Sequence, residues 1–498
     1  MRSDSPMEAS STPAVRPDTQ ATWRRCLLVC VAFAGIGASL PAAAARCYVN
    51  GGASGANTGV SWANAYTNLQ SALLNASCSE TWVAQGLYKP VVPVNIGSVT
   101  LAERAIAFNI APNVAVYGGF SGGETNLTER DAAAHPTILS GDIDNNDDSN
   151  NADGNSVNES HTDISGSNSR HVVVMNGTAV GMPISANTVL DGFTLTGGDN
   201  TNAGQPTEAG GALWCRGDGA THDCSPTLAR LTVSGNRALN GGGIAFIGAV
   251  SGASSPTLTH IMFRGNRATS QFGGAMYIYA EASGTSSPKL AHATFSDNSS
   301  AQFGGAIANN PTAGGIGSPT LTNVTFIGNS AIQGGAVFNN ADQDSSPAFT
   351  SVTFTGNSAG FGGAMYNAGA GLTVTLNNVI LWGDSAVTSG AEIFDSAAVS
   401  VINWGIVSGS CPNNCSNLVT GDPLLGPLAG NGGLTPTLMP AAGSAAINAV
   451  PCYVALATDQ RAFARPDPAS AAVANPCDLG AVEAGSFDWV FGNGFDTP

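Results

Sequence analysis

Five consecutive segments of the chain repeat one order of apolar and polar positions. They begin at Ser225, Ser255, Ser287, Ser318 and Ser346, so that successive starts are 30, 32, 31 and 28 residues apart. Each segment holds two short apolar runs, separated by an asparagine-containing turn and by paired glycines. No run is long enough for a helix, so the pattern predicts short strands joined by turns.

The repeats place similar residues at equivalent positions, which form columns when the segments are aligned. Three columns are apolar: Leu213, Ile244, Met276, Ile307, Val337 and Met365; Val233, Phe263, Phe295, Phe326 and Phe354; Leu228, Leu258, Leu290, Leu321 and Phe349. A fourth column is Asn236, Asn266, Asn298, Asn329 and Asn357. One unit cannot bury its own apolar face, so the units must stack. We therefore expect phenylalanine and asparagine ladders with a structural role.

These columns predict an all-β fold, a parallel β-helix with one coil per repeat. We expect the solenoid over 97–410, with clear repeats over 210–380, and a rise of about 4.8 Å per coil. The runs 171–175 and 189–198 are interpreted as degenerate coils. Residues 46–96 would hold the N-terminal cap and first strands, with an amphipathic helix over Ser61–Ala76 and a strand over 81–88. Residues 411–486 would form a C-terminal cap or small module.

The N-terminal residues 1–45 have the pattern of an export signal. Arg24 and Arg25 precede an apolar run from Cys26 to Leu40, and small residues follow it. The alternative is a membrane anchor, but the run is short for a spanning helix of about 20 residues. No later stretch of the chain is apolar enough to span a bilayer, so we expect no transmembrane segment after signal removal.

Charge and cysteine content fit an exported protein. The formal net charge is −17, which disfavours nucleic-acid binding and docking to anionic membranes. Eight cysteines follow the signal, and an even number in an exported chain suggests disulfides. The disulfide candidates are Cys47, Cys78, Cys215, Cys224, Cys411, Cys415, Cys452 and Cys477. Many connectivities are open. Pairing of neighbours along the chain is the simplest, and metal binding by Cys411 and Cys415 is the alternative.

The acidic segment 141–155 holds five aspartates and five asparagines. The alternating oxygen ligands of a calcium loop are present at Asp142, Asp144 and Asn146, and Asp148 is a further candidate. The segment is not an EF-hand, because Asp147 replaces the expected glycine and no glutamate follows at the twelfth position. A solvated surface loop is the simpler interpretation, and a calcium site, the one cofactor that the sequence suggests, is the alternative.

Catalytic residues are hard to find in this sequence. Glycoside hydrolysis needs two carboxylates facing one bond, whereas the repeat columns carry Thr, Ser, Gly and Asn, and Asp297 aligns with Gly265 and Gly328. One polar column could bind a metal or contain coupled imidazoles, although exposed polar residues at a bend are the simpler interpretation; it comprises Arg230, His260, His292, Asn323 and Ser351. Further acidic candidates in irregular insertions are Asp191, Glu208, Asp218 and Asp223.

Several motifs resemble known families. The repeats, such as Gly304-Gly305-Ala306-Ile307 and Phe295-Ser-Asp-Asn298, resemble the polymorphic outer-membrane-protein repeat of secreted bacterial proteins. TDQRAFARP and CDLGAVE resemble the C-terminal choice-of-anchor module, and the tail 487–498 resembles one found on exported proteobacterial proteins. The resemblance implies a right-handed, pectin-lyase-like β-helix that is secreted or displayed on the cell surface.

The sequence thus predicts an exported cell-surface or secreted protein without catalytic activity. It would be an adhesion platform whose partners are polysaccharide, extracellular matrix or other cells. A polysaccharide lyase or glycoside hydrolase is the alternative from another class, and a passive structural protein is the third.

Overall fold

The computed structural model describes residues 45–92, 104–147, 156–178, 183–201, 209–340, 344–452, 456–468 and 476–485. The predicted export signal, apart from Ala45, and the predicted tail lie outside these residues. None of the helices among the described residues is long and apolar enough to cross a membrane.

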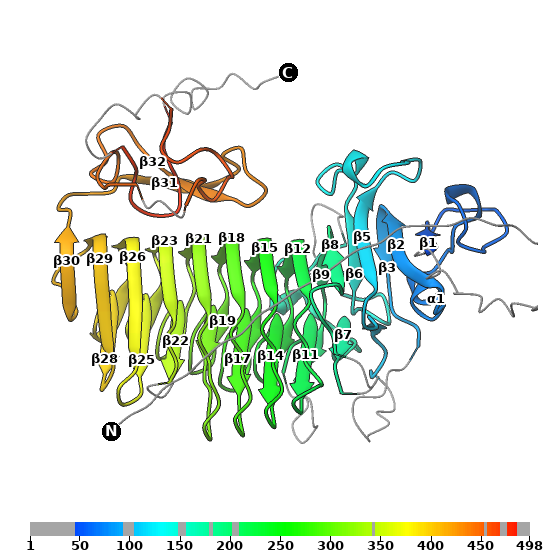
Figure 1. Ribbon diagram of the computed structural model, residues 1–498, viewed down its shortest axis with the longest axis horizontal. Coiled ribbons are helices and arrows are strands. Elements are labelled where there is room, and N and C mark those ends of the chain that lie inside the picture. Colours follow the sequence, from blue (N-terminus) through cyan, green and yellow to red (C-terminus); the bar gives the residue numbers. More distant parts are fainter. Residues whose placement is uncertain are drawn as a thin grey trace, which may run out of the picture. The chain divides into compact units, whose positions relative to one another are not determined.

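Parallel strands form the main sheet of a β-helix, and they follow one another along its axis (Figure 1). Its path is β1 (Ala45–Val49), β2 (Cys78–Ala84), β5 (Ala115–Phe120), β8 (Val189–Asp191), β12 (Thr227–Ser234), β15 (Thr257–Arg264), β18 (Lys289–Ser296), β21 (Thr320–Ile327), β23 (Ala348–Thr355), β26 (Thr373–Trp382), β29 (Val399–Val407) and β30 (Asn414–Leu418), with β3 (Gly86–Tyr88), β6 (Thr137–Ser140) and β9 (Thr194–Thr196) as a branch.

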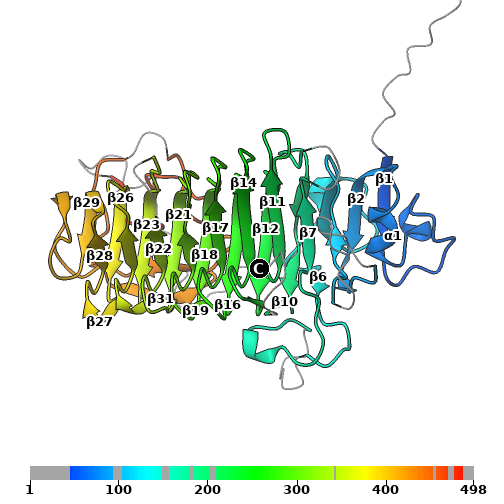
Figure 2. The same ribbon diagram turned by 90° about the horizontal axis from the view of Figure 1, so that it is seen from below.

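A second parallel sheet forms another face of the coils. It contains β4 (Phe108–Asn109), β7 (Val173–Asn176), β11 (Leu213–Asp218), β14 (Ile244–Ala249), β17 (Met276–Ala280), β20 (Ile307–Asn309), β22 (Val337–Asn340), β25 (Met365–Ala368) and β28 (Ile393–Ser396). Short strands between the two sheets are β10 (Asp199–Asn200), β13 (Arg237–Ala238), β16 (Arg267–Ala268), β19 (Ser299–Ser300), β24 (Ser358–Phe361) and β27 (Ser385–Ser389). Figure 2 shows these short strands along one edge of the solenoid.

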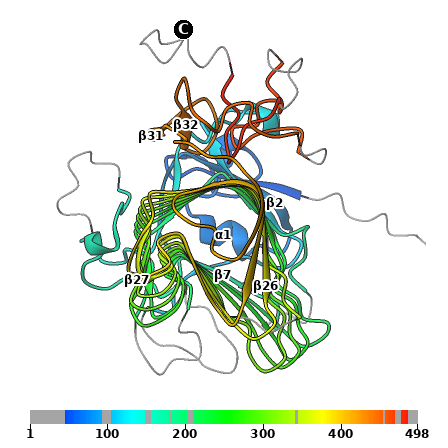
Figure 3. The same ribbon diagram turned by 90° about the vertical axis from the view of Figure 1, so that its left-hand side faces the viewer.

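The strand register follows the columns of the repeat. Leu213 pairs with Ile244 and Ile244 with Met276, while Phe263 pairs with Phe295 and Phe295 with Phe326. Successive coils therefore superimpose when seen along the axis (Figure 3). The rings of Phe263, Phe295, Phe326 and Phe354 stack with centroid distances of 4.5, 4.8 and 4.7 Å and are fully buried. The prediction of a parallel β-helix is confirmed.

The asparagine column forms a hydrogen-bonded ladder inside the solenoid. In each coil the backbone N and side-chain Nδ2 of one asparagine donate to Oδ1 of the next, as Asn266 does to Asn298 at 3.1 and 3.0 Å. Nδ2 also donates to a backbone carbonyl, for example from Asn298 to Phe263 O at 3.1 Å. The ladder thus satisfies buried backbone groups at the turn of every coil.

The N-terminal end differs from the predicted single helix over Ser61–Ala76. The structure has a 3₁₀ helix η1 (Trp62–Asn64) and a short α1 (Leu69–Leu73). Tyr66 lies between them, where it bridges to Val49 as a strand would, and the Asn68 side chain caps α1 by accepting from Gln70 N. The predicted strand over 81–88 is likewise interrupted at Gln85. Short 3₁₀ helices also occur in loops, as η2 (Leu127–Glu129) and η3 (His161–Asp163).

The C-terminal segment is a module on the side of the solenoid rather than a cap over its end. The main sheet continues past the predicted boundary at 410 into β30, and the module follows with the antiparallel pair β31 (Leu425–Ala429) and β32 (Thr437–Pro440). The module residues Ala446, Val450 and Leu479 pack with Ile380 and Ile406 of the main sheet. It therefore covers the outer face of the later coils (Figure 1).

The eight cysteines that were predicted to form disulfides make four of them, each between neighbouring cysteines along the chain. The pairs are Cys47–Cys78, Cys215–Cys224, Cys411–Cys415 and Cys452–Cys477. Cys47–Cys78 joins β1 to β2, and Cys452–Cys477 closes a loop of the C-terminal module.

Candidate functional site

A column of left-handed residues bends each strand of the main sheet. Arg230, His260, His292, Asn323 and Ser351 have φ values of 47°, 55°, 56°, 54° and 54°. Each of them interrupts the pairing between its flanking residues. The rings of His260 and His292 stack in parallel with centroids 4.8 Å apart. The predicted bend is therefore present, and its side chains form a line across the coils.

The predicted exposure of this column is wrong for its later members. Asn323 is 1% exposed and Ser351 is fully buried. The reason is the C-terminal module, because Asn323 Nδ2 donates to Thr458 O at 2.9 Å. His292 also contacts the module, with its Nδ1 at 3.2 Å from Gln460 O. Only the earlier part of the column, at Arg230 and His260, faces an open surface.

A groove with a volume of about 340 Å³ lies over this open part of the main sheet. Its floor comes from β9, β12 and β15, where Thr194, Thr232 and Met262 form one outward-facing column. The loop after β5 contributes one wall and Leu434 of the C-terminal module contributes another. The full lining is Arg130, Asp131, Ala132, Ala133, Thr137, Gly192, Phe193, Thr194, Arg230, Leu231, Thr232, His260, Met262 and Leu434.

An ion cluster fixes the side chains at the base of the groove. Asp191 is 4% exposed, and its carboxylate accepts from Arg130 Nη2 at 2.6 Å and from Arg230 Nε at 2.8 Å. Arg130 also donates to Gly118 O, which ties the loop to the sheet. Two guanidinium groups thus share one carboxylate. Asp191 was a candidate acid from the sequence. In the structure, its carboxylate positions the side chains of Arg130 and Arg230.

His260 is neutral at physiological pH. Burial, followed by the neighbouring His292 and Arg230, lowers its pKa to about 4. Its Nδ1 lies 3.0 Å from Thr259 Oγ1. The other carboxylate of the groove belongs to Asp131, whose Oδ1 accepts the N–H groups of Ala133 and Ala134. The groove thus offers hydroxyl, imidazole and guanidinium groups beside the apolar Phe193, Met262 and Leu434, which is a surface suited to hydrogen-bonding ligands with apolar faces.

The remaining acidic candidates do not converge on the groove. Asp218 pairs with Arg216 at 3.0 Å, and Asp223 Oδ1 accepts from Ala253 N at 2.8 Å. Asp297 is exposed in a left-handed turn. Glu208 lies outside the described residues.

The proposed calcium ligands are engaged by protein groups where the structure describes them. Asp142 pairs with Lys89 Nζ at 2.7 Å, and Asp144 Oδ2 accepts from Ser167 N at 2.9 Å. Within the described part of the chain, no three His, Cys, Asp or Glu side chains gather as a metal site. Asp148 lies outside that part, and calcium binding by this loop stays a prediction.

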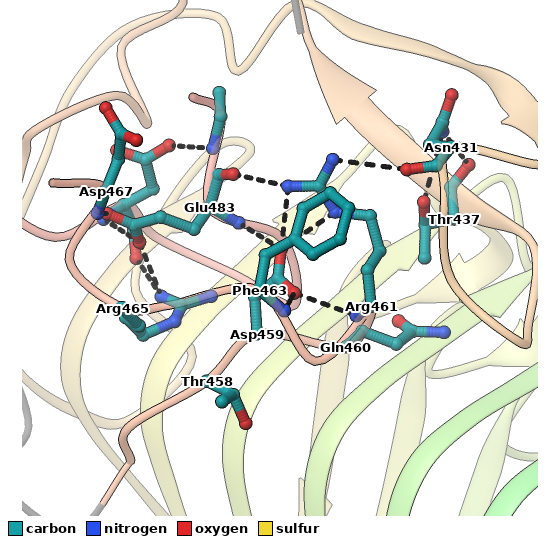
Figure 4. A network of polar contacts seen from close by, with 12 residues as sticks. Asn431, Thr437, Thr458, Asp459, Gln460, Arg461, Phe463, Arg465, Asp467 and Glu483 are labelled. Atoms are coloured by element: carbon teal, nitrogen blue, oxygen red, sulfur yellow. Dashed lines mark hydrogen bonds and ion pairs between the residues drawn. The ribbon is translucent and has the colours of Figure 1, made fainter. Parts of the chain in front are cut away.

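A buried polar network stabilises the C-terminal module (Figure 4). Arg461 Nη2 lies 2.8 Å from Asp459 Oδ2, and Arg465 Nη1 lies 3.4 Å from Glu483 Oε2. All four residues are at most 5% exposed. Arg461 also donates to Glu483 O, and its guanidinium stacks over Phe463. Because these side chains are paired and enclosed, the network is structural, and it places the segment 458–460 against the solenoid.

Gln460 connects the module to the coils. Its Nε2 donates to Ala293 O at 3.1 Å and to Thr294 Oγ1 at 2.8 Å, and its Oε1 accepts from Thr325 Oγ1 at 2.7 Å. Thr294 and Thr325 continue the outward column of Thr194, Thr232 and Met262. The module therefore occupies the same column that remains open in the groove.

Four residues of the groove and of the module contact were not predicted from the sequence: Arg130, Thr232, Met262 and Gln460. A signal for Thr232 and Met262 is present, since each directly precedes a member of the ladder column and so must face outward in a strand. No local signal places Arg130 or Gln460, because their partners lie 61 and 166 residues away.

Comparison with known proteins identifies one repeat. The Chlamydia polymorphic membrane protein (Chlamydia_PMP) repeat matches residues 292–310, which include Phe295, Asn298 and the segment Gly304–Ile307. No curated protein matches the chain. This repeat, on a parallel β-helix, points to a bacterial outer-surface protein.

Proposed function

We propose that this chain is an exported, non-catalytic surface protein that binds a glycan or matrix polymer in the groove between the β5 loop and the C-terminal module. The observation that carries the proposal is the open column of Thr194, Thr232 and Met262, flanked by the neutral His260 and the fixed Arg230. Hydroxyls and a guanidinium bind sugar oxygens, while Met262 and Leu434 provide apolar contact area.

The arrangement of the carboxylates supports binding rather than hydrolysis. Both oxygens of Asp191, at the base of the groove, accept from arginines, and Asp131 is the single carboxylate among the residues that line the groove. A pair of carboxyl groups with separate acid and base roles needs free oxygens facing one bond. The C-terminal module, whose sequence resembles a choice-of-anchor domain, would attach or orient the solenoid at the cell surface so that many copies bind with avidity.

The test is a screen of the purified protein on neutral and acidic glycans and matrix proteins, with two matched variants. Thr232→Trp fills the groove, and we expect it to weaken binding at least tenfold. Thr257→Trp adds the same ring at an exposed position of the neighbouring strand β15, outside the groove lining, and should bind like the unchanged protein.

Two results would contradict the proposal. Release of reducing ends from any polysaccharide would indicate a polysaccharide-degrading enzyme, which is the alternative function. A protein that binds none of the glycans, matrix proteins or cells would instead be a structural spacer.

A further inference from the structure

The last complete coil, from β26 to β28, changes two columns of the solenoid interior to acidic residues. The asparagine ladder ends at Asp384, whose Oδ1 accepts from Asn357 N at 2.7 Å and from Asn357 Nδ2 at 2.8 Å. The alanine of the Gly-Gly-Ala turn is replaced by Glu392, as the backbone bond from Ala364 N to Glu392 O at 2.9 Å demonstrates. In the preceding coils these columns hold Asn329 and Asn357, and Ala336 and Ala364.

Both acidic side chains are buried and incompletely satisfied. Asp384 is 7% exposed and Glu392 is 4% exposed. The two carboxyl groups lie against each other, and Asp384 Oδ2 and both carboxylate oxygens of Glu392 receive no well-formed hydrogen bond from a donor elsewhere in the described chain. Burial raises the pKa of both groups, and the charge of Asp384 raises that of Glu392 further. Two charged carboxylates facing each other in a buried site are costly, so the pair must either hold a proton or bind a cation.

Among the described residues, no lysine or arginine acts on Asp384 or Glu392. The sequence contains no lysine or arginine between Lys289 and Arg461. The arginines of the C-terminal module, Arg461 and Arg465, are paired with Asp459 and Glu483. In the described part of the chain, neutralisation of the pair is therefore left to a proton or to a bound cation.

We propose that Asp384 and Glu392 bind a divalent cation with the chemistry of Ca²⁺ inside the last coil. Calcium prefers oxygen ligands and accepts both oxygens of one carboxylate, which Glu392 offers, and it completes its coordination with backbone carbonyls or water. The cation would close the end of the solenoid by joining the ladder turn at 384 to the turn at 392. This site is separate from the groove and from the segment 141–155.

The experiment compares thermal unfolding in 2 mM CaCl₂ and in EDTA, together with a calorimetric calcium titration. Calcium should raise the Tm of the unchanged protein by about 2–5 °C. The double variant Asp384→Asn with Glu392→Ala gives the last coil the residues of the other coils. We expect it to fold without calcium and to lose the calcium shift.

Two single variants control the assignment. Asp395→Asn changes a carboxylate of β28 that Asn367 and Ser400 already engage. Asp144→Asn changes the exposed acidic loop. Both should keep the full calcium shift. The proposal is overturned if the unchanged protein shows no shift, if its stability responds to pH but not to calcium, or if the double variant responds as the unchanged protein does.

Discussion

Phe326 lies between two parallel rings in the interior of the solenoid. Its centroid is 4.8 Å from that of Phe295 and 4.7 Å from that of Phe354, and it is fully buried. The neighbouring rings cannot move far into the space that a removed ring would leave, because each ring is fixed by its own strand.

Phe326→Ala should therefore lower the free energy of unfolding by about 3–5 kcal/mol. The measurement is urea unfolding followed by circular dichroism. Phe303→Ala, which removes a half-buried ring from the outer aromatic cluster, is the matched control and should cost clearly less. Equal losses in the two variants would contradict the stacked core.

The residues of the ladders could be predicted because they depend only on the repeat. Once the repeat is aligned, Phe263 must lie over Phe295, and this stacking does not depend on contacts with the rest of the chain. The exposure of Asn323 could not be predicted, because Thr458, from a distant part of the chain, accepts its side-chain hydrogen bond. The same limit applies to the N-terminal helix, where pairing of Tyr66 with Val49 overrides the helical spacing of Trp62, Leu69 and Leu73.

At the scale of the element, the C-terminal module contains carboxyl groups that hold protons near neutral pH. Burial raises the pKa of Glu483 from its usual 4.5 to about 7 and that of Asp478 to about 6. A carboxyl with a raised pKa binds its proton more tightly in the folded state. Its contribution to stability is therefore complete at pH below about 4 and is lost as the pH rises through 6 and 7.

We accordingly expect the free energy of unfolding to fall between pH 4.5 and 7.5, with Glu483 contributing up to about 3 kcal/mol. Glu483→Gln mimics the protonated form and should flatten this part of the profile. Urea unfolding across the pH range measures it, and the difference between the two profiles isolates Glu483 from Asp384 and Glu392. Parallel profiles would refute the assignment.

At the scale of the whole molecule, Gln460 makes several of the hydrogen bonds that dock the module on the solenoid. Gln460→Ala would leave the Ala293 carbonyl and the Thr325 hydroxyl without their partners in a buried interface. Hydrogen exchange of the Ala481 amide, which donates to Thr353 Oγ1, should then accelerate at least tenfold.

Asn431→Ala serves as the control for Gln460→Ala. The Asn431 side chain bonds only within the module, to Thr437. Exchange at Ala481 should stay near its original rate in this variant. Acceleration of the same size in both variants would mean that module stability, rather than docking, governs the exchange.

The candidate groove could be predicted from the sequence only in part. The outward column of Thr232 and Met262 follows from strand alternation, but the groove exists only because Arg130 holds one wall and the module forms the other. Both depend on contacts between distant segments.

The position of the module also limits what can lie in the groove. The column is open at Thr194, Thr232 and Met262, and Pro436 already accepts the Thr294 hydroxyl at the next coil. Three coils span only about 10 Å along the axis. A long straight polymer lying along the solenoid axis would collide with the module, whereas a chain terminus or a sharply bent branch point would fit. The protein would then recognise the ends of polymers in preference to their middles.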